Sequence, residues 1–450
     1  MGYRNSDSGG KSAEAPNVLL TDTNRWPAPA RLAIGLAKAG CNVSAICPTP
    51  GHPLLKTRAV RRTFSYSGIR PLDSLVAAIE ATQPQFIVPC DDRGVRHLHE
   101  LHARASDQGE PGRKLAALIE RSVGSPESYP VVSARYDLLS IAREEGSRVP
   151  RTDLITSVDD LAPWRAGETL PWVLKSDGSW GGRGVRIART PEQAEQFFLE
   201  LTRPPGARET IKRLIMNRDR FRLWTWWDRS TPAVIAQSHI QGRPANCAVV
   251  CWEGRVLGGI GVEVVSAQGL KGPATVVRVV ENPEMMLCAE RIARRLHLSG
   301  FFGLDFMIED GTGLAYLIEM NPRCTPLCHL QLGPGRDMVG TLVAQLQNRP
   351  YRVEPAVTEN EMIAYFPQAW NCRSEFLDAS FQDIPQGEPE LIQDLLHPWS
   401  ERSLPGRLVD RLRRGRPPAE ALASCVFAPA AASSQADEAW SAAGGSRVSK

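Results

Sequence analysis

Acidic and amide side chains interrupt two neighbouring apolar segments between positions 303 and 323. The segment GLDFMIEDGTGLAYLIEMNPR has the pattern of two strands joined by a turn at Asp310-Gly311. Asp305 lies on the first arm, and Glu319 and Asn321 lie on the second, two residues apart and therefore on one face. An unpaired carboxylate within an apolar strand is costly, which disfavours ordinary turn acids. The pattern predicts three oxygen ligands of the kind that Mg²⁺ takes beside a phosphate.

A lysine and four glycines form a second group, in the stretch WVLKSDGSWGGRGVRIA. A β-rich run ends at Lys175, a loop carries the glycines, and the strand-like run VRIA follows. A P-loop would lead into a helix, so this segment is predicted to be a hairpin whose exposed amides can approach phosphates closely. A glycine-rich hairpin alone indicates little, and the strand lysine beside it strengthens the prediction of a phosphate site.

Both segments, in this order and at about this separation, resemble the ATP-grasp superfamily, with EMNPR as the most specific motif. The resemblance covers roughly residues 16–348 and implies that ATP and Mg²⁺ (or Mn²⁺) are bound. It implies that Lys175 contacts the α- and β-phosphates and that Arg323 stabilises charge developing on the γ-phosphate or an acyl phosphate. The implied metal ligands are Asp305, Glu319 and Asn321.

The stretch VIAQSHIQGRPAN resembles the superfamily strand that grips adenine. A glutamate that often follows its glycine is absent, since Gly242 is followed by Arg243, which puts the ribose contact in doubt. Arg135, in VVSARYDLL, stands where many relatives have their first lysine, and its guanidinium keeps the positive charge. The nucleotide contacts implied in all are Arg135, Lys175, Ser179, Gly181, Gly182, Arg183, Gly184, Gln237, Ser238, His239 and Ile240.

Other candidate groups have plainer interpretations. Arg278 and Arg336 could grip an anionic substrate or form structural salt bridges. Trp224, Trp226 and Trp227 are interpreted as sheet packing rather than substrate stacking. The histidines at positions 97, 99 and 102 are expected to be solvated rather than metal ligands. Cys324, Cys328 and His329 lack the second ligand pair of a zinc site, so buried packing is the prediction. The arginine-rich stretch 402–416 is interpreted as a solvated helix face.

The elements that must position these groups follow an α/β pattern. Apolar strands at NVLL, at Asn42–Cys47 and at Phe86–Pro89 alternate with helical stretches, and the first and third strands end at acids, where open parallel sheets bind ligands. No GxGxxG follows the first strand, which argues against a dinucleotide. The predicted fold class is α/β (α+β), with an N-terminal Rossmann-like pre-ATP-grasp domain followed by a two-lobed ATP-grasp domain. The predicted divisions are 1–15 disordered, 16–124 pre-ATP-grasp, 125–348 ATP-grasp, 349–427 a C-terminal segment without assigned role, and 428–450 a disordered tail.

The composition of the chain limits the classes of molecule that it is expected to bind. The 450 residues are 42% hydrophobic and 23% charged, with a formal net charge of +3, too small for the basic field of most nucleic-acid binders. No run of about 20 apolar residues is present, so no membrane partner is expected. The ten cysteines contain no CxxC pair, which favours a reducing, cytoplasmic location. A homodimer is an expectation from the resemblance alone.

These observations predict an ATP-dependent ligase that activates a small-molecule carboxylate as an acyl phosphate and couples it to an amine. Two alternatives remain open at this stage. One is a bicarbonate-dependent carboxylase of the same fold, and the other is a non-catalytic nucleotide-binding regulator. The joint presence of Lys175, Asp305, Glu319, Asn321 and Arg323 disfavours the second.

Overall fold

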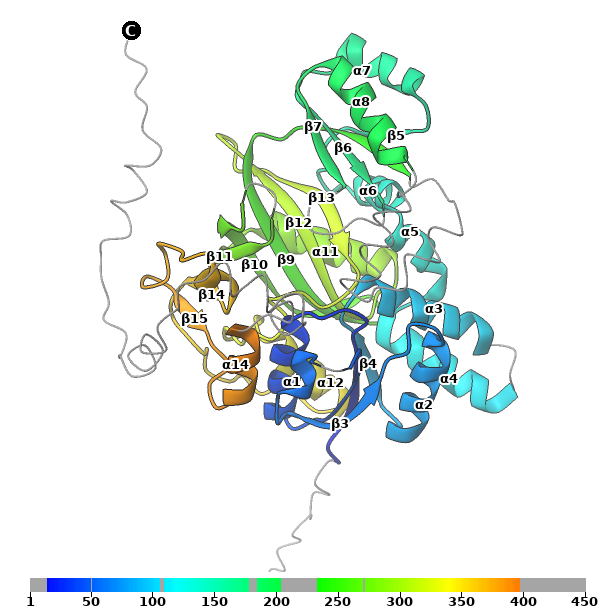
Figure 1. The fold of residues 1–450 in the computed structure, drawn as a ribbon, viewed down its shortest axis with the longest axis vertical. Coiled ribbons are helices and arrows are strands. Elements are labelled where there is room, and N and C mark those ends of the chain that lie inside the picture. Colours follow the sequence, from blue (N-terminus) through cyan, green and yellow to red (C-terminus); the bar gives the residue numbers. More distant parts are fainter. Residues whose placement is uncertain are drawn as a thin grey trace, which may run out of the picture.

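Three β-sheets organise the chain in the computed structural model (Figure 1). The structure describes residues 14–49, 51–105, 109–177, 184–203, 233–269 and 272–396. In Figure 1 a small sheet lies at the top, a large sheet in the middle, and an N-terminal sheet at the bottom. Residues 1–13 of the predicted disordered segment 1–15, the predicted tail 428–450, the tryptophans at 224, 226 and 227, and the stretch 402–416 lie outside the described residues.

The N-terminal sheet is parallel and has the strand order β3-β2-β1-β4. Its strands are β1 (Asn17–Thr21), β2 (Asn42–Cys47), β3 (Val60–Ser65) and β4 (Phe86–Pro89). The helices that accompany them are α1 (Ala28–Lys38), α2 (Pro71–Thr82), α3 (Asp92–Ala105) and α4 (Gly109–Val123). The three predicted strands are confirmed, and β3 is an additional edge strand.

The small sheet is antiparallel, with the order β5-β8-β6-β7. It contains β5 (Thr152–Ile155), β6 (Trp172–Ser176), β7 (Val185–Ala188) and β8 (Val234–Ser238), with helices α7 (Ala162–Gly167) and α8 (Pro191–Thr202). The short helix α5 (Tyr129–Ser133) and helix α6 (Arg135–Glu144) precede it. The predicted strand-loop-strand arrangement around Lys175 is confirmed, because β6 pairs with β7 and Lys175 faces Val185 in the register.

The large sheet has seven strands in the order β13-β12-β9-β10-β11-β14-β15. Its strands are β9 (Gly242–Trp252), β10 (Arg255–Ala267), β11 (Ala274–Val279), β12 (Gly300–Glu309), β13 (Ala315–Asn321), β14 (Met362–Tyr365) and β15 (Phe381–Asp383). Its helices are α11 (Pro283–Arg295) and α12 (Met338–Leu346).

The two faces of the large sheet are buried in different cores because side chains alternate along each strand. Cys247 of β9 packs with residues of α6 and α11. Its neighbour Ala248 packs in the other core, with residues of α1, α12 and the N-terminal strands. The second face therefore joins the large sheet to the N-terminal unit.

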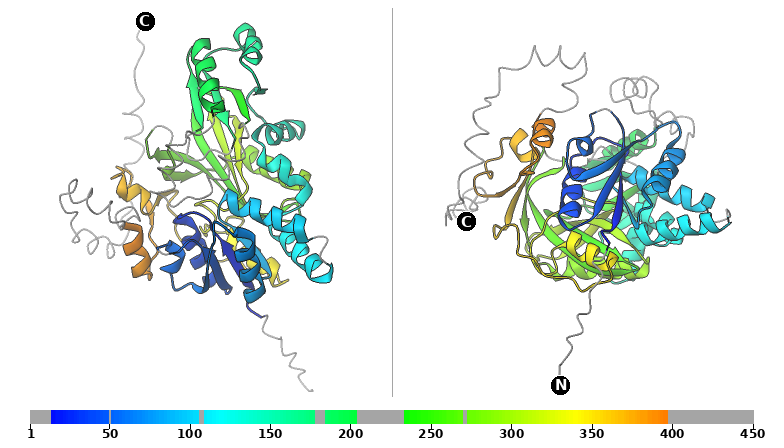
Figure 2. Two further views of the ribbon diagram at one scale, coloured as in Figure 1. Left: turned by 45° about the vertical axis from the view of Figure 1, so that its right-hand side comes forward. Right: turned by 90° about the horizontal axis from the view of Figure 1, so that it is seen from below.

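The C-terminal part of the described chain continues the large sheet. Strands β14 and β15 extend it beyond β11, and helices α13 (Gln368–Asn371) and α14 (Pro389–Leu396) accompany them. Figure 2 shows α14, in orange, beside the blue N-terminal helix. Ion pairs join the two regions: Asp394 pairs with Arg25 at 2.5 Å, and Asp383 pairs with Arg31. Asp383 also accepts a hydrogen bond from His329 Nε2 at 2.8 Å.

Nine cysteines lie in the described part of the chain, all as free thiols, and eight of them are buried. Cys324 and Cys328 are 1% and 0% exposed, as their interpretation as packing residues predicts. No helix among the described residues is both long enough and apolar enough to span a membrane.

Candidate active site

The β12–β13 hairpin brings the predicted metal ligands together. Asp305 faces Glu319 across the two strands, Gly303 faces Asn321, and a bulge follows Asp305. Asn321 Nδ2 donates a hydrogen bond to Asp305 Oδ2 at 3.2 Å. Asn246 Nδ2, from the adjacent strand β9, donates to Asp305 Oδ1 at 2.6 Å. Asn246, Asp305 and Glu319 thus form one row across β9, β12 and β13, and Asn321, two residues further along β13, adds its amide to the Asp305 carboxylate.

Asp305 and Glu319 place two carboxylates close together at this row, so positive charge nearby would stabilise them. Burial, aided by the negative charge of Glu319, raises the pKa of Asp305 to about 6, although the amide donors Asn246 and Asn321 oppose the rise. The ionised form of such a carboxyl is stabilised when a cation binds beside it.

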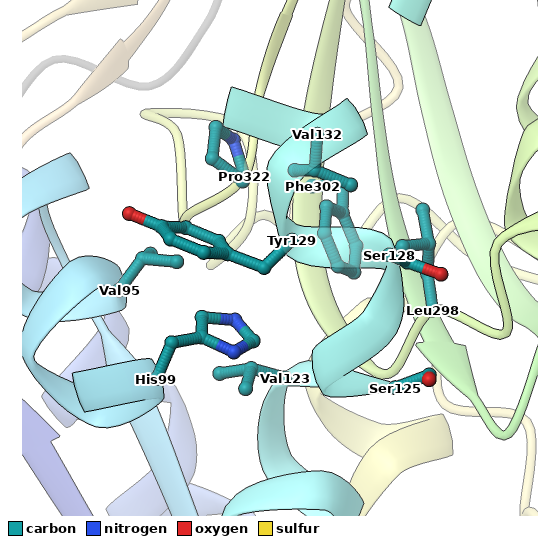
Figure 3. Close-up of a pocket in the computed structure, with 10 residues that line it drawn as sticks. All are labelled: Val95, His99, Val123, Ser125, Ser128, Tyr129, Val132, Leu298, Phe302 and Pro322. Atoms are coloured by element: carbon teal, nitrogen blue, oxygen red, sulfur yellow. The ribbon is translucent and has the colours of Figure 1, made fainter. Parts of the chain in front are cut away.

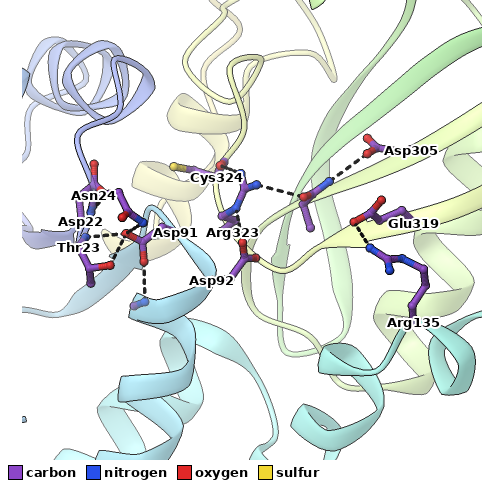
Figure 4. A network of polar contacts seen from close by, with 12 residues as sticks. Asp22, Thr23, Asn24, Asp91, Asp92, Arg135, Asp305, Glu319, Arg323 and Cys324 are labelled. Atoms are coloured by element: carbon purple, nitrogen blue, oxygen red, sulfur yellow. Dashed lines mark hydrogen bonds and ion pairs between the residues drawn. The ribbon is translucent and has the colours of Figure 1, made fainter. Parts of the chain in front are cut away.

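Arg135 supplies one cation, from the first turn of α6. Its Nη2 donates to Glu319 Oε1 at 2.7 Å (Figure 4). Its Nη1 donates to Ser176 O at 3.0 Å and to Asp177 Oδ1 at 3.2 Å. This guanidinium therefore connects β13 of the large sheet with the end of β6 in the small sheet.

Lys175 supplies a second cation and is almost fully buried, with 5% of its surface exposed. Its Nζ donates a hydrogen bond to Ile318 O at 3.3 Å. Burial, aided by the positive charge of Arg135, lowers the pKa of Lys175 to about 8, while Glu319 and Asp305 oppose that change. The ammonium is thus held at the same row as the carboxylates, in a setting that favours an additional anion.

Arg323 closes the site on the side of the N-terminal unit. Its Nε donates to Asp92 Oδ2 at 3.2 Å, its Nη2 to Asn321 Oδ1 at 3.1 Å, and its Nη1 to Cys324 O at 3.3 Å. Burial alone would lower the pKa of Arg323, but the charge and hydrogen bond of Asp92, together with the nearby Cys324 and Asp91, outweigh burial and raise the pKa. The guanidinium stays charged, and through Asn321 it is linked to Asp305, one of the predicted metal ligands.

The predicted phosphate loop is only partly described. Ser179, Gly181, Gly182 and Arg183 lie outside the described residues. At its edges, Ser176 N donates to Gly184 O at 3.0 Å, so the loop leaves and rejoins paired strands next to Lys175.

The predicted adenine strand is β8 with the residues that follow it. Gln237 is 2% exposed, and its Nε2 donates to Thr152 Oγ1 at 3.1 Å. Ser238 N donates to Arg151 O, and Ser238 Oγ donates to Glu168 Oε1 at 2.8 Å. His239 is exposed and Ile240 is half-buried. The side chain of Gln237 and the amide of Ser238 are thus used within the small sheet.

Several other candidates lie away from this row. Arg278 faces Glu263 in the register, whereas Val262 continues the row of Asn246 and Asp305, so Arg278 lies on the opposite face of the sheet. Arg336 forms an ion pair with Glu281.

The histidines of α3 are not solvated, contrary to the expectation from the sequence. His97 is hydrogen-bonded to Tyr66 Oη at 3.0 Å, and His102 to Glu120 at 2.7 Å. His99 stacks on Tyr129 with ring centroids 4.1 Å apart. The reason is that α4 and α5 cover this helix, so its polar stripe is buried between elements.

A cavity of about 10 Å³ lies beside this stack and reaches Pro322 (Figure 3). Its volume is close to that of one water molecule and too small for a nucleotide. A cavity of about 190 Å³ lies beside α11, with Arg148, Glu284 and Arg291 in its lining. Neither cavity is lined by the acidic, amide or cationic side chains of the candidate site.

Two residues at the site were not identified from the sequence. Asn246 interrupts an apolar strand in the same way as Glu319, and that signal was present in the alternation of β9. In the sequence, Asp92 could be recognised only as an acid that follows a parallel strand. Its contact with Arg323 joins residues 231 positions apart, so no local pattern indicates it.

Residues 141–326 match the family described as the ATP-grasp domain. No curated protein matches the sequence significantly. Solved structures share the fold. N5-carboxyaminoimidazole ribonucleotide synthetase from Thermus thermophilus is 14% identical, with 75% of this chain and 80% of that chain covered and a TM-score of 0.52.

Two further structures are biotin carboxylases. The enzyme from Campylobacter jejuni is 14% identical, with 76% and 74% of the two chains covered and a TM-score of 0.52. The biotin carboxylase domain of Hydrogenobacter thermophilus 2-oxoglutarate carboxylase, solved with MgADP and bicarbonate, is 16% identical, with 76% and 71% covered and a TM-score of 0.51. At these identities the likeness establishes the fold: the chain has a mixed α/β architecture with the ATP-grasp fold.

Proposed function

We propose that this protein is an ATP-dependent ligase that phosphorylates a carboxylate and couples the resulting acyl phosphate to an amine. One observation carries the proposal: Lys175, Arg135 and Arg323 surround the Asp305–Glu319–Asn321 row, where the two sheets and the N-terminal unit meet. Asp177 and Asp92 also pair with Arg135 and Arg323, so the site holds charges of both signs, as a metal-bound polyphosphate needs: carboxylates for the metal and cations for the phosphates.

The donor set fits Mg²⁺. Asp305, Glu319 and the amide oxygen of Asn321 would hold the ion, all from one hairpin. The site offers two carboxylates and one amide, and no group of three or more His, Cys, Asp and Glu side chains is arranged for a metal anywhere in the described ranges. When bound, Mg²⁺ would neutralise phosphate charge during phosphoryl transfer.

The cation set fits a triphosphate. Arg135 Nε is buried and has no partner among the residues described. The Lys175 ammonium has three N–H groups and, within the same ranges, one acceptor. We assign these donors to the phosphates, together with Ser179, Gly181, Gly182, Arg183 and Gly184 of the loop. The backbone of Ser238, His239 and Ile240 and the side chain of Gln237 are proposed to border the adenine.

In the proposed reaction a carboxylate oxygen attacks the γ-phosphorus and ADP leaves. The amine then attacks the acyl carbon, the phosphate leaves with the electrons of the acyl C–O bond, and the nitrogen loses a proton. The protein contributes position and charge: Lys175 and Arg135 hold ATP, while Arg323 stabilises the negative charge that develops on the transferred group.

Carboxylation is the second candidate. It is supported by the names of the structural neighbours, one of which was solved with bicarbonate. Bicarbonate would take the place of the carboxylate, so the first step would be the same and only the acid supplied would differ.

The experiment is Mg²⁺-dependent ADP release across pooled carboxylates and amines, repeated with bicarbonate as the only acid. Release that needs both an acid and an amine supports the ligase, and release that needs bicarbonate supports carboxylation. Glu319→Ala should abolish release, whereas Glu290→Ala, an exposed acid on α11, should not. ATP binding without release from any pool would contradict both reactions.

A further inference from the structure

Arg323 is fixed from two parts of the chain that are far apart in sequence. Asn321 accepts from one arm of its guanidinium, and Asp92 of the N-terminal unit accepts from Nε. The side chains of Arg323 and Asp92 are 20% and 32% exposed, so the pair is only partly open to solvent. An ion pair in this setting is screened less than one at the surface.

Asp92 is itself held in place by the acid next to it. Asp91 accepts hydrogen bonds from Thr23 N at 2.6 Å, from Thr23 Oγ1 at 2.8 Å and from Gly94 N at 2.7 Å. These contacts fix the turn between β4 and α3, where Asp92 is the first helical residue. The two adjacent acids therefore differ: Asp91 is buried within the N-terminal unit, and Asp92 extends to Arg323 (Figure 4).

A second contact fixes the same junction, because Cys324 N donates to Pro89 O at 3.4 Å. The backbone immediately after Arg323 thus lies against the end of β4. With the backbone fixed in this way, the direction of the long Arg323 side chain depends on its three acceptors, of which Asp92 is the only charged one and the only one from the N-terminal unit.

We propose that Asp92 is a positioning residue, which holds the Arg323 guanidinium in the orientation needed to stabilise the transferred phosphoryl group. This inference rests on the proposed function. Without Asp92, Arg323 Nε would lose its charged acceptor, and the guanidinium would keep only the neutral acceptors Asn321 Oδ1 and Cys324 O. Asp92 touches neither Lys175 nor Arg135, so ATP binding should not depend on it.

The test is the split between turnover and ATP binding in Asp92→Asn. We expect kcat to fall roughly 10- to 100-fold, since a misplacement of about 1 Å can cost about 100-fold. The dissociation constant for ATP, measured by calorimetry, should change less than about twofold. Asp92→Glu keeps the charge and should recover part of the loss.

The matched control is Asp73→Asn, because Asp73 also lies in the first turn of an N-terminal helix and pairs with an arginine, Arg70. It should leave kcat and ATP binding unchanged. In the Arg323→Gln background, Asp92→Asn should have no further effect on kcat.

The outcomes distinguish the positioning role of Asp92 from the proposed function of the protein. An active wild type, an inactive Arg323→Gln variant and a normal Asp92→Asn variant would overturn the positioning role alone. Equal loss of ATP binding and turnover in Asp92→Asn, with no recovery in Asp92→Glu, would mean a structural role and also overturn it. No ADP release from wild type under any condition would instead reject the proposed function.

Discussion

Lys175 combines deep burial with a cationic neighbour, and two predictions follow from that residue. The first concerns its charge. At an effective dielectric constant near 20, a cation about 4 Å from a phosphate oxygen contributes about 4 kcal/mol before desolvation. Lys175→Ala should therefore weaken ATP binding and turnover by at least about 100-fold, measured by calorimetry and ADP release. Lys114→Ala removes an exposed lysine and should change neither; near-normal turnover of the Lys175 variant would contradict the site.

The second prediction concerns pH. The pKa of Lys175 is lowered to about 8, chiefly by burial, and the charged form is the one that binds phosphate. As the pH rises through about 8, the free protein loses this charge, and ATP binding must then take up a proton. The affinity for ATP should therefore fall above pH 8. Lys175→Arg stays charged and should show a flatter profile. Equal profiles for the two proteins over about pH 7 to 9.5 would exclude Lys175 as the titrating group.

At the scale of residues, contacts between positions close in sequence could be predicted, and contacts between distant positions could not. Asp305, Glu319 and Asn321 were identifiable because polar residues in an apolar hairpin stand out locally. The partners of Arg135 could not be identified, because its contacts with Asp177 and Glu319 span 42 and 184 positions. Burial of the α3 histidines could likewise not be predicted from the sequence, since it depends on which helices cover that face.

At the scale of elements, the hairpin depends on close approach at Gly303. A Cβ atom there would overlap Cγ2 of Thr325, in the loop that follows Arg323. Gly303→Ala should lower the free energy of unfolding by about 1–3 kcal/mol and reduce turnover by displacing that loop. Urea unfolding and ADP release measure the two effects.

Thr325→Ser removes the overlapping methyl group and should restore both properties in the Gly303→Ala background. Gly68→Ala is the control, because a Cβ at Gly68 meets nothing within 4 Å. Failure of Thr325→Ser to restore stability would show that the overlap lies elsewhere.

Elements were predictable where the pattern was strong. The sequence run FIVP is wholly apolar and forms β4 as expected. Strand β3, VRRTFS, carries two arginines and lies at a sheet edge with most of its residues exposed, so it lacked the apolar signal used to find strands. The strand order also depends on long-range pairing that no local pattern specifies.

For the whole molecule, Asp383 joins three regions that are distant in sequence. It pairs with Arg31 of α1 and with His329, and all three side chains are at most 11% exposed. Burial alone would raise the pKa of Asp383, but the charges of His329 and Arg31 lower it. Asp383→Asn leaves Arg31 buried without its counter-charge and should lower the free energy of unfolding by about 3 kcal/mol.

The pH dependence of this loss has a definite sign. Because the pKa of Asp383 is lower in the folded protein, its stabilisation is fully present above the unfolded pKa of about 4. It should disappear as the pH falls through the folded value, where wild type and variant converge. Asp378→Asn, an exposed acid in the same segment, is the control for urea unfolding at about pH 7. A difference between wild type and Asp383→Asn that stays constant to low pH would contradict this account.

The ion pair between Arg25 and Asp394 has a consequence for synthesis of the chain. Its partners lie 369 positions apart. At about 5–20 residues per second, a ribosome needs roughly 20–70 s to make the intervening chain. During that time Arg25 and Arg31 have already been synthesised, whereas their acidic partners have not. The flank of the N-terminal unit that carries these two arginines can therefore close only after Asp383 and Asp394 have left the ribosome.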